Sequence, residues 1–362
     1  MNIEIIYDII IMQYQLKDKL MKTILYQAHE LNQASVQKHI KSVLEQGGLV
    51  VFPTETVYGI GANALKDEAV KGIYHAKGRP SDNPLIVHVS KTEDIYKYAI
   101  DVPDQASLLI KAFMPGPLTL VLHKHPSLST TVTGGLDTVA IRVPNHKVAL
   151  KVIEISGLPI CAPSANLSGR PSSTQVDHVL QDFDGKVDII IDGGPTEIGL
   201  ESTVLDLTSN VPTILRPGRV TQTMIESVLM MNIVDASEHQ VMNTPKSPGM
   251  KYTHYAPKGR LTIVNGEFQS ILAYLKEQVI LDSSIGIICP TEYANLIQAK
   301  HLYDLGSLDH IQEIGAHIFS ALRHMDQLNI KQIFIPSLPA DGLGKVIMNR
   351  LIKASGHHII SV

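Results

Sequence analysis

The chain has 362 residues, which is more than one compact domain usually needs, so its length predicts two domains. With 44% hydrophobic and 18% charged residues, the composition is that of an ordinary globular protein and excludes the disordered and membrane classes. The net charge of −4 argues against nucleic-acid binding over the whole surface, although it is compatible with a local basic cleft. An aromatic content of 5% without Trp leaves few platforms on which single-stranded bases could stack.

Residues 1–20 are predicted to be an N-terminal extension outside the fold, because Met21 opens the run MKTILYQ and is a second candidate start. The run IEIIYDIIIM is interrupted by acids and is shorter than the ~20 residues of a membrane span. No basic segment precedes it, as a signal peptide would require. The only two cysteines, Cys161 and Cys289, stand in apolar runs, so we expect a reducing, cytoplasmic location and no disulfide framework or metal cluster.

The first domain is predicted over residues 21–235, and its first helix runs from Ser35 to a closing Gly47. Further helices are predicted at 67–78, 104–113, 145–155, 175–182 and 222–231. Strands are predicted at 49–52, 84–89, 117–123, 138–143, 159–162, 187–192, 202–207 and 213–216. This alternation is typical of an α/β domain with a mixed sheet.

Two permanent cations, Lys77 and Arg79, lie on a loop bracketed by Pro80 and Pro84, between a predicted helix and an apolar strand. The ammonium is a point charge and the guanidinium a planar fork, and both match phosphate oxygens. The prolines fix φ and reduce the entropy that is lost when the loop is ordered. A solvated helix end that complements the helix dipole is the simpler explanation of the cations alone. The proline bracketing, together with the resemblance described below, favours a site for a polyanion.

A second run, APSANLSGRPSST at 162–174, also places hydroxyl and amide side chains around Gly-Arg-Pro after a predicted strand. Its Ser164 and Asn166 could instead cap the next helix. The sequence contains no GxxxxGK[ST] motif, so ATP would not bind through a P-loop. The run GIGANA at 59–64 imitates a dinucleotide-binding fingerprint, but no helix clearly opens on its glycines. We expect these glycines in a loop that passes close to the sheet.

Several polar residues stand in or beside predicted strands. His88, alone in an apolar strand, would usually be a core histidine with satisfied hydrogen bonds. Arg142 in TVAIRVP needs a partner, and an acid such as Asp206 is one candidate. Glu197 and Glu201 show no spacing that supports a paired-carboxylate mechanism, so they are expected to be structural.

Residues 236–258 are rich in Pro, Gly and polar side chains and predict a linker, after which the second domain covers 259–362. Its predicted strands are 260–264, 285–289, 301–305 and 333–337. Its predicted helices are 267–279, 291–299, 309–328 and 344–355. Strict alternation indicates a small parallel sheet wound with helices, in the manner of a Rossmann fold.

The chain resembles the threonylcarbamoyl-AMP synthases of the YrdC/YwlC type, in their long two-domain, Sua-type form. The resemblance covers residues 48–218 and includes both Gly-Arg-Pro runs. The other matching segments are PTETVYGIGANA at 53–64, PGPLTLVL at 115–122, DTVAIRVPNH at 137–146, GLESTVLDL at 199–207 and LRPG at 215–218. So many segments in the same order make a chance match improbable. The resemblance implies a catalytic domain with a twisted mixed sheet and a basic cavity, followed by a small C-terminal Rossmann-like domain.

The same resemblance assigns roles to individual residues. It implies that Lys77 and Arg79 are catalytic. The residues implied for ATP are Arg79, Asn83, Thr138, Ser164, Asn166, Ser172, Arg216 and Tyr255. The residues implied for threonine are Thr56, His88, Arg142 and Ser202, with Arg142 on the substrate carboxylate. The linker is expected to lie over the cavity as a lid, with Tyr255 touching the nucleotide.

The implied reaction condenses L-threonine, bicarbonate and ATP to threonylcarbamoyl-AMP and pyrophosphate. Mg²⁺ is expected on the triphosphate, held by phosphate oxygens and water, and no metal bound by protein ligands is expected. The product would serve threonylcarbamoyladenosine formation in tRNA next to the anticodon, carried out by other transferase proteins. Whether tRNA binds this chain directly stays open, and no membrane partner is expected.

Two alternatives belong to other classes. One is a non-catalytic module that binds double-stranded RNA or tRNA in the same basic cavity, with an affinity that depends steeply on salt. The other is a maturation factor that uses carbamoyl phosphate, because such proteins carry a related domain. The second alternative normally brings zinc-finger cysteines and an acylphosphatase-like segment, and this sequence has neither.

Overall fold

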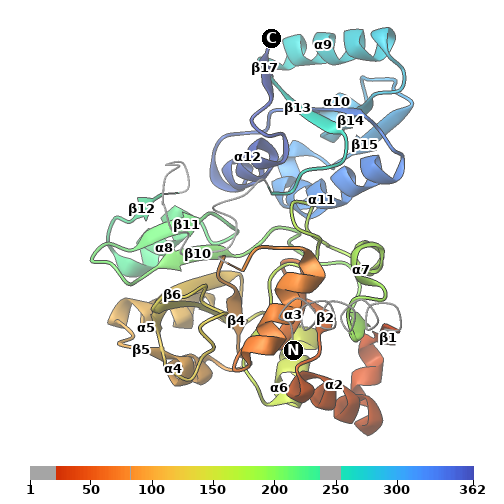
Figure 1. Ribbon diagram of the computed structural model, residues 1–362. Helices are drawn as coiled ribbons and strands as arrows, with labels where there is room; N and C mark the ends of the chain where they lie inside the picture. Colours follow the sequence, from red (N-terminus) through yellow and green to blue (C-terminus); the bar gives the residue numbers. More distant parts are fainter. Residues whose placement is uncertain (1–21, 82, 237–253) are drawn as a thin grey trace, which may run out of the picture.

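The structure, a computed structural model, describes residues 22–81, 83–236 and 254–362, and these residues form two sheets with their helices (Figure 1). The predicted extension at 1–20 and most of the predicted linker lie outside the described residues. Within the part that is described, no helix combines the length and the apolar character needed to cross a membrane.

The first sheet is mixed and has twelve strands. Its strands are β1 (Ile24–Gln27), β2 (Val50–Pro53), β3 (Tyr58–Asn63), β4 (Ile86–His88), β5 (Ala99–Ile100), β6 (Leu118–Lys124), β7 (Thr138–Arg142), β8 (Ile160–Cys161), β9 (Ile189–Asp192), β10 (Thr203–Asp206), β11 (Thr213–Arg216) and β12 (Val234–Asp235). They lie in the order β1-β9-β2-β3-β8-β4-β7-β6-β10-β11-β12, with β5 paired to β6. The mixed sheet predicted for this domain is therefore confirmed.

Helices cover this sheet on both faces. They are η1 (Ala28–Asn32), α2 (Ala34–Gln46), α3 (Asp67–Lys77), η2 (Thr92–Asp94), α4 (Ile95–Tyr98), α5 (Asp104–Phe113), α6 (Lys147–Ser156), α7 (Val176–Phe183) and α8 (Gln222–Leu229). Alternate residues of β2 enter different cores, because Val51 packs with residues of α3 whereas Val50 and Phe52 pack with residues of α2 and α6. The helix α3 ends at Gly78, which adopts the left-handed conformation that glycine favours. This end of α3 directs Lys77 toward the sheet.

The run GIGANA is not a loop, contrary to the expectation from the sequence. Its residues 59–63 lie in β3, which pairs antiparallel with β2 and with β8. A Cβ atom at Gly61 would lie 2.6 Å from Phe52 and 2.9 Å from Ile160, so only glycine fits between these strands. The glycines therefore serve close packing within the sheet, and α3 begins only at Asp67, after the strand.

The second domain has a five-stranded sheet in which every pairing is parallel. Its elements are β13 (Arg260–Asn265), α9 (Phe268–Leu281), β14 (Gly286–Cys289), α10 (Thr291–Ala294), β15 (His301–Asp304), η3 (Leu308–His310), α11 (Ile311–Gln327), β16 (Gln332–Pro336), α12 (Gly342–Ala354) and β17 (Ile359–Ser361). The order β15-β14-β16-β13-β17 confirms the predicted parallel, helix-wound sheet. The sequence did not predict β17, and α10 is shorter than the predicted helix.

The two domains share a hydrophobic core. Val57 and Leu200 of the first domain, together with Tyr255, pack with residues of the second domain in one buried cluster. The helices α11 and α12 face the first domain (Figure 1), and each inserts a buried arginine, Arg323 and Arg350. The domain interface therefore lies directly beside the edge of the first sheet that carries the candidate site.

Candidate active site

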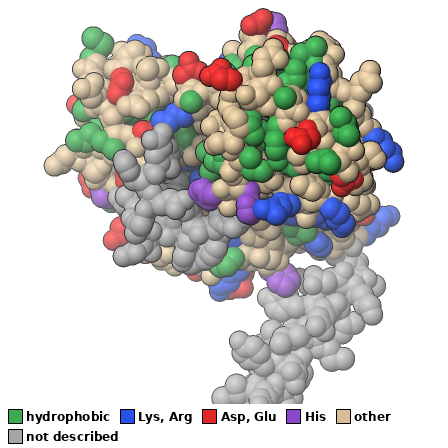
Figure 2. All heavy atoms as spheres, turned by 90° about the horizontal axis from the view of Figure 1, so that it is seen from above, with side chains coloured by type: hydrophobic (Ala, Val, Ile, Leu, Met, Phe, Trp, Pro, Cys, Tyr) green, Lys and Arg blue, Asp and Glu red, His purple; other side chains and the backbone are tan. Residues whose placement is uncertain are grey.

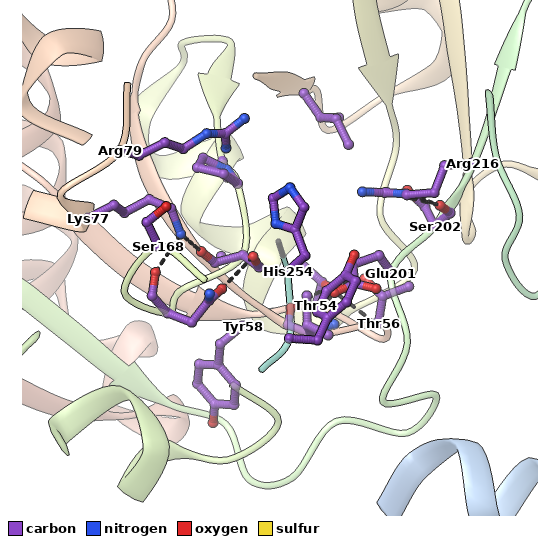
Figure 3. Close-up of a pocket in the computed structure, with 18 of the residues that line it drawn as sticks. Thr54, Thr56, Tyr58, Lys77, Arg79, Ser168, Glu201, Ser202, Arg216 and His254 are labelled. Atoms are coloured by element: carbon purple, nitrogen blue, oxygen red, sulfur yellow. Dashed lines mark hydrogen bonds between the residues drawn. The ribbon is translucent and has the colours of Figure 1, made fainter. Parts of the chain in front are cut away.

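A cavity lies where the ends of β3, β4 and β7 meet the loop after β8 and the start of β10 (Figure 3). It encloses about 730 Å³ of empty space, counted with the part that opens to solvent. Its walls are formed by Thr54, Thr56, Val57, Tyr58, Gly59, Lys77, Arg79, Ile86, His88, Arg142, Ala162, Pro163, Ser164, Asn166, Ser168, Gly169, Glu201, Ser202, Arg216, His254 and Tyr255. Most of the residues predicted from the sequence for ATP and for threonine thus come together in one place.

Lys77 and Arg79 lie on one wall of this cavity, as Figure 3 shows. The Lys77 side chain is buried, and its Nζ donates to the carbonyl oxygens of Ser164 at 2.5 Å and Asn166 at 2.6 Å. Burial, and then the neighbouring Arg79 charge, lowers the pKa of Lys77 well below its usual value. The lysine thus joins the two Gly-Arg-Pro runs, and a bound anion would stabilise its charged form.

The backbone of Asn83 holds the loop that carries Arg79, from behind the cavity wall. Its carbonyl oxygen accepts hydrogen bonds from Tyr74 Oη at 2.8 Å and from Arg79 Nη2 at 3.3 Å. The Asn83 side chain is fully buried, and among the described residues neither its amide nitrogen nor its amide oxygen has a hydrogen-bond partner. Buried amides are almost always paired, so this pair of atoms fits a ligand contact. Asn83 does not itself line the cavity.

Arg142, the last residue of β7, anchors a second group of polar side chains. Its Nη2 lies 2.5 Å from Glu55 Oε1, its Nη1 donates to Thr56 Oγ1 at 3.0 Å, and its Nε donates to the carbonyl oxygen of Gly116 at 3.1 Å. The Arg142 and Glu55 side chains are both buried, and Arg142 lines the cavity while Glu55 lies behind it. Such contacts hold the guanidinium in one orientation, which suits recognition of a planar carboxylate.

The acid that pairs with Arg142 is Glu55, so Asp206, the partner considered from the sequence, is wrong. Asp206 ends β10, and its carboxylate accepts hydrogen bonds from Thr208 at 2.8 and 2.6 Å. Strand order explains the difference, because β6 lies between β7 and β10 and separates the two residues. Glu55 stands in the connection between β2 and β3, directly before Thr56, which the family resemblance assigned to the same substrate as Arg142.

His88, the last residue of β4, faces Arg142 across the parallel pair β4–β7. It is buried and lines the cavity, and its Nδ1 lies 3.2 Å from the carbonyl oxygen of Ile86. Burial, and then the Arg142 charge, lowers the pKa of His88 to about 3. A neutral imidazole beside Arg142 can donate or accept a hydrogen bond without adding charge.

Ser202 and Arg216 form the opposite wall (Figure 3). Arg216 Nε and Nη2 donate to the Ser202 carbonyl oxygen at 3.1 and 3.0 Å, and Nη2 also donates to Ser202 Oγ at 3.1 Å. Ser202 Oγ is 2.8 Å from Thr119 Oγ1. Burial lowers the pKa of Arg216 to about 10, which leaves the guanidinium charged near neutral pH.

Tyr255 closes the cavity from the side of the second domain. Its side chain is buried, and its ring stacks on Phe319 with a centroid distance of 5.1 Å. The adjacent His254 also lines the cavity, and Ala256 N donates to the Gly169 carbonyl oxygen at 2.8 Å. This end of the predicted lid therefore contacts the site, and residues 237–253 of the prediction lie outside the described residues.

Two other predicted residues do not reach the cavity wall. Thr138 begins β7, at the opposite end of the strand from Arg142, and is half-buried. Ser172 is buried behind the wall, where its Oγ donates to Glu201 Oε1 at 2.6 Å. Since neither lines the cavity, a contact with ATP would require the wall to move or the nucleotide to extend beyond it.

Several residues of the wall were not predicted from the sequence, among them Thr54, Tyr58, Ser168 and Glu201. Thr54, Tyr58 and Ser168 all stand within segments that carried the family resemblance. Their place in those segments was the signal from which they could have been predicted as site residues. Glu201 was expected to be structural, and it does bind Ser172 Oγ and Arg350 Nε, but it also lines the cavity.

The electrostatic character of the cavity differs from that of the outer surface. Of the lining residues that the structure describes, Lys77, Arg79, Arg142 and Arg216 are cationic and Glu201 is a carboxylate. By contrast, Lys and Arg are interspersed with Asp and Glu on the face that Figure 2 shows. Among the described residues, no group of three or more His, Cys, Asp or Glu side chains could hold a metal ion. The cavity is therefore suited to anionic ligands.

Comparison with known proteins gives the same family along both domains. The family model described as "Telomere recombination" matches residues 42–218, and the one described as "Threonylcarbamoyl-AMP synthase, C-terminal domain" matches residues 220–356. A threonylcarbamoyl-AMP synthase of Pyrococcus abyssi is 47% identical over 327 residues, which is 88% of this chain and 94% of that protein. The protein of that name from Bacillus subtilis is 46% identical over 88% of this chain and 92% of its own length.

Solved structures agree with these sequence matches. The crystal structure of P. abyssi Sua5 complexed with L-threonine superposes with a TM-score of 0.86 at 43% identity, and the match covers 94% of this chain and 99% of that one. A double variant of the same P. abyssi protein superposes with a TM-score of 0.87. The similarity therefore extends over both domains and their relative arrangement.

Proposed function

Because the chain belongs to the threonylcarbamoyl-AMP synthase family, we propose that it condenses L-threonine, bicarbonate and ATP to threonylcarbamoyl-AMP and pyrophosphate. The observation that carries this proposal is the cavity itself, in which Lys77 with Arg79 and Arg142 with Thr56 form two separate groups. Two anionic groups can bind there at the same time, a triphosphate on the first pair and a carboxylate on the second.

The threonine end is assigned to Arg142. Its guanidinium is held by Glu55, Thr56 and Gly116, so it presents a fixed face to the cavity. The neutral His88 lies beside it and can hydrogen-bond the substrate hydroxyl or amine. The P. abyssi structure with bound L-threonine supports a threonine site in this fold.

The nucleotide end is assigned to the loop that begins at Lys77. Lys77 and Arg79 supply the charge for the phosphates, and Ser164 and Asn166 line the wall next to Lys77. The unpartnered amide of Asn83 is a further candidate for a contact with ATP once the loop adjusts. Mg²⁺ enters as part of the substrate, coordinated mainly by phosphate oxygens and water.

The chemistry needs positioning and charge stabilisation more than a protein nucleophile. The threonine amine adds to bicarbonate, with loss of water, to give a carbamate. A carbamate oxygen then forms a bond to the α-phosphorus of ATP while the bond to the pyrophosphate oxygen breaks. Lys77 and Arg79 stabilise the negative charge on the phosphates, and Arg142 holds the threonine carboxylate so that the carbamate lies in line.

The product is a mixed anhydride of a carbamic and a phosphoric acid, and such compounds transfer their acyl group readily. We propose that its acceptor is the tRNA adenosine next to the anticodon, modified by separate transferase proteins. A reducing, cytoplasmic setting fits the two cysteines, which are both free and buried in the structure.

The decisive experiment is the release of pyrophosphate from ATP by the purified protein. We expect release only when L-threonine and bicarbonate are both present, and Lys77→Ala should reduce the rate by about 10²-fold or more. Lys97→Ala is the matched control, because Lys97 is an exposed lysine that pairs with Asp94 at 2.7 Å and does not line the cavity. Equal turnover without threonine would refute the proposal, and salt-sensitive RNA binding with no turnover would favour a nucleic-acid-binding module.

A further inference from the structure

Arg350 is a buried charge of the second domain that reaches into the first domain. It lies on α12, and its side chain is 1% exposed. Its Nε donates to Glu201 Oε2 at 2.9 Å, and its Nη2 donates to the carbonyl oxygen of Pro217 at 2.9 Å. Its guanidinium also lies over the ring of Tyr255, 5.7 Å from the centroid. One side chain thus contacts three segments that meet at the cavity.

Each of these segments carries part of the cavity wall. Glu201 lines the cavity and directly precedes Ser202, while Pro217 directly follows Arg216. Ser202 and Arg216 are joined by three hydrogen bonds, so the two segments form one unit of the wall. Arg350 contacts this unit beside Ser202, through Glu201, and beside Arg216, through Pro217. These two contacts restrict the position of the unit.

The charge balance makes the contact with Glu201 important. Burial alone would raise the pKa of Glu201, but the charges of Arg350 and Arg216 and the hydrogen bond from Ser172 leave it lowered. The carboxylate is therefore charged and buried. Without Arg350 the Glu201 carboxylate would lose its closest cation. It would then form a new contact with Arg216, or water would enter to hydrate it.

We propose that Arg350 is a positioning residue, through which the second domain sets the geometry of Ser202, Arg216 and Tyr255 in the catalytic cavity. This inference rests on the proposed function, because the effect is defined on the same site. It assigns the second domain a part in catalysis that is exerted through the residues of the cavity wall. A displacement of about 1 Å in a positioned group can lower a rate by about 10²-fold, so the contribution is measurable.

The test compares Arg350→Gln, Arg350→Lys and the double variant Arg350→Gln/Glu201→Gln with the wild-type chain. ATP and L-threonine affinities are measured by calorimetry, and kcat and KM are measured by pyrophosphate release. We expect Arg350→Gln to lose about 10²-fold in kcat/KM, with ATP affinity also reduced. The double variant removes both buried charges, so it should recover at least part of the loss.

Arg350→Lys keeps the charge but lacks the planar guanidinium that donates to Glu201 and Pro217 at once. Its kcat/KM and ATP affinity should therefore lie between those of the wild type and of Arg350→Gln. If Arg350→Gln does not fold, the kinetics and affinities of Arg350→Lys test the positioning role in its place. The matched control is Lys345→Ala, which removes another contact between the domains, Lys345 with Asp235 at 3.1 Å. Neither residue of that pair lines the cavity, so kinetics and affinities should be unchanged.

The outcomes separate this inference from the proposed function. If the wild-type chain shows no threonine-dependent release of pyrophosphate, the proposed function fails, while the ATP affinities of the variants still test Arg350. If the wild type is active and folded Arg350→Gln and Arg350→Lys match it in kcat, KM and ATP affinity, the positioning role is refuted. A loss of thermal stability with unchanged kinetics would likewise refute it, because that is the result of a purely structural contact.

Discussion

Arg142 shows how a single strand residue is held in place in the wall of the cavity. It is buried at the end of β7, and its three donor groups have separate partners in Glu55, Thr56 and Gly116. A charge in that position is costly unless it is paired, and the pairing fixes the direction of the planar group. The orientation of the guanidinium, more than its charge, is therefore what should matter for threonine.

Arg142→Lys keeps the charge and removes the fork. We expect the KM for L-threonine to rise more than the KM for ATP, since a single ammonium cannot reproduce the contacts with Thr56 and a carboxylate together. Steady-state kinetics with each substrate varied in turn measure both constants. A larger rise in the KM for ATP would show that the two ends of the cavity have been assigned the wrong way round.

His88 gives the protein a stability that depends on pH. Its pKa is about 3 in the folded chain, because of burial first and of Arg142 second, against an ordinary value of 6.5. Between these two pH values the unfolded chain binds a proton that the folded chain does not. The contribution of His88 to the free energy of unfolding is therefore fully present above pH 6.5. It is lost as the pH falls toward 3, by about 1.4 kcal/mol per pH unit.

The variant His88→Gln should remove this part of the pH dependence. Between pH 7 and pH 5, the free energy of unfolding of the variant should fall by roughly 2 kcal/mol less than that of the wild type, as measured by urea denaturation. Between pH 8 and pH 7 the two proteins should change equally, because the imidazole is then neutral in both states. Equal falls between pH 7 and pH 5 would mean that His88 is protonated or solvated in the fold.

The connection after β11 illustrates how an element end is fitted to the site. A Cβ atom on Gly218 would lie 2.4 Å from Thr203 N, 2.7 Å from the Ser202 carbonyl carbon and 2.8 Å from Glu201 O. All three are backbone atoms at or just before the start of β10, so no rotamer change can relieve the clash. This glycine lets the segment that follows Arg216 lie directly against the segment that carries Ser202.

Gly218→Ala should therefore destabilise the fold by about 1–3 kcal/mol, as overpacking usually does, and should lower activity by displacing Ser202. Gly72→Ala is the matched control, because its added Cβ would make only ordinary contacts with Leu49, at 3.6 Å and beyond, inside α3. Alanine in a helix interior is favoured over glycine by up to about 1 kcal/mol, so the control should be neutral or stabilising. Urea denaturation and pyrophosphate release distinguish the two, and a tolerated Gly218→Ala would contradict the packing described here.

The two domains are held together by buried polar contacts as well as by a shared core. Arg323 of α11 is 1% exposed, lies 2.7 Å from Asp182, and donates through Nε and Nη2 to the Pro171 carbonyl oxygen at 3.1 and 2.7 Å. Arg170, by contrast, pairs with Asp326 across the same interface at 2.8 Å while 24% of its side chain is exposed. Two arginine contacts of different burial therefore join the same two domains.

Arg323→Met should weaken domain docking by about 3–5 kcal/mol, because it leaves Asp182 buried without its arginine. Scanning calorimetry should then show a lower transition temperature, with the two domains unfolding separately. Arg170→Ala removes a partly exposed pair and should cost much less. Similar thermograms for the wild type and Arg323→Met would mean that the contact of Arg323 with Asp182 does not stabilise domain docking.

Whether a segment forms a helix or a strand follows largely from local sequence patterns. Most of the helices and strands could therefore be predicted from the sequence. The α2 and α3 helices end at Gly47 and Gly78, as the glycine signal indicated, and the strict alternation in the second domain predicted its parallel sheet. The same local reasoning failed for β3, whose glycines resembled a loop. There, pairing with β2 on one side and with the distant β8 on the other overrode the weak strand propensity of glycine.

The sequence by itself determined which residues carry charge and which loops are stiffened by proline, because these properties act over a few positions. Only the tertiary structure decided which of them meet. His88 lies beside Arg142 because β4 pairs with β7, and Glu55 replaces Asp206 as the partner of Arg142 because β6 separates β7 from β10. Arg350 and Glu201 are 149 residues apart, and their contact depends on how two domains dock. Strand order and domain docking arise from the packing of the whole chain, which no local pattern contains.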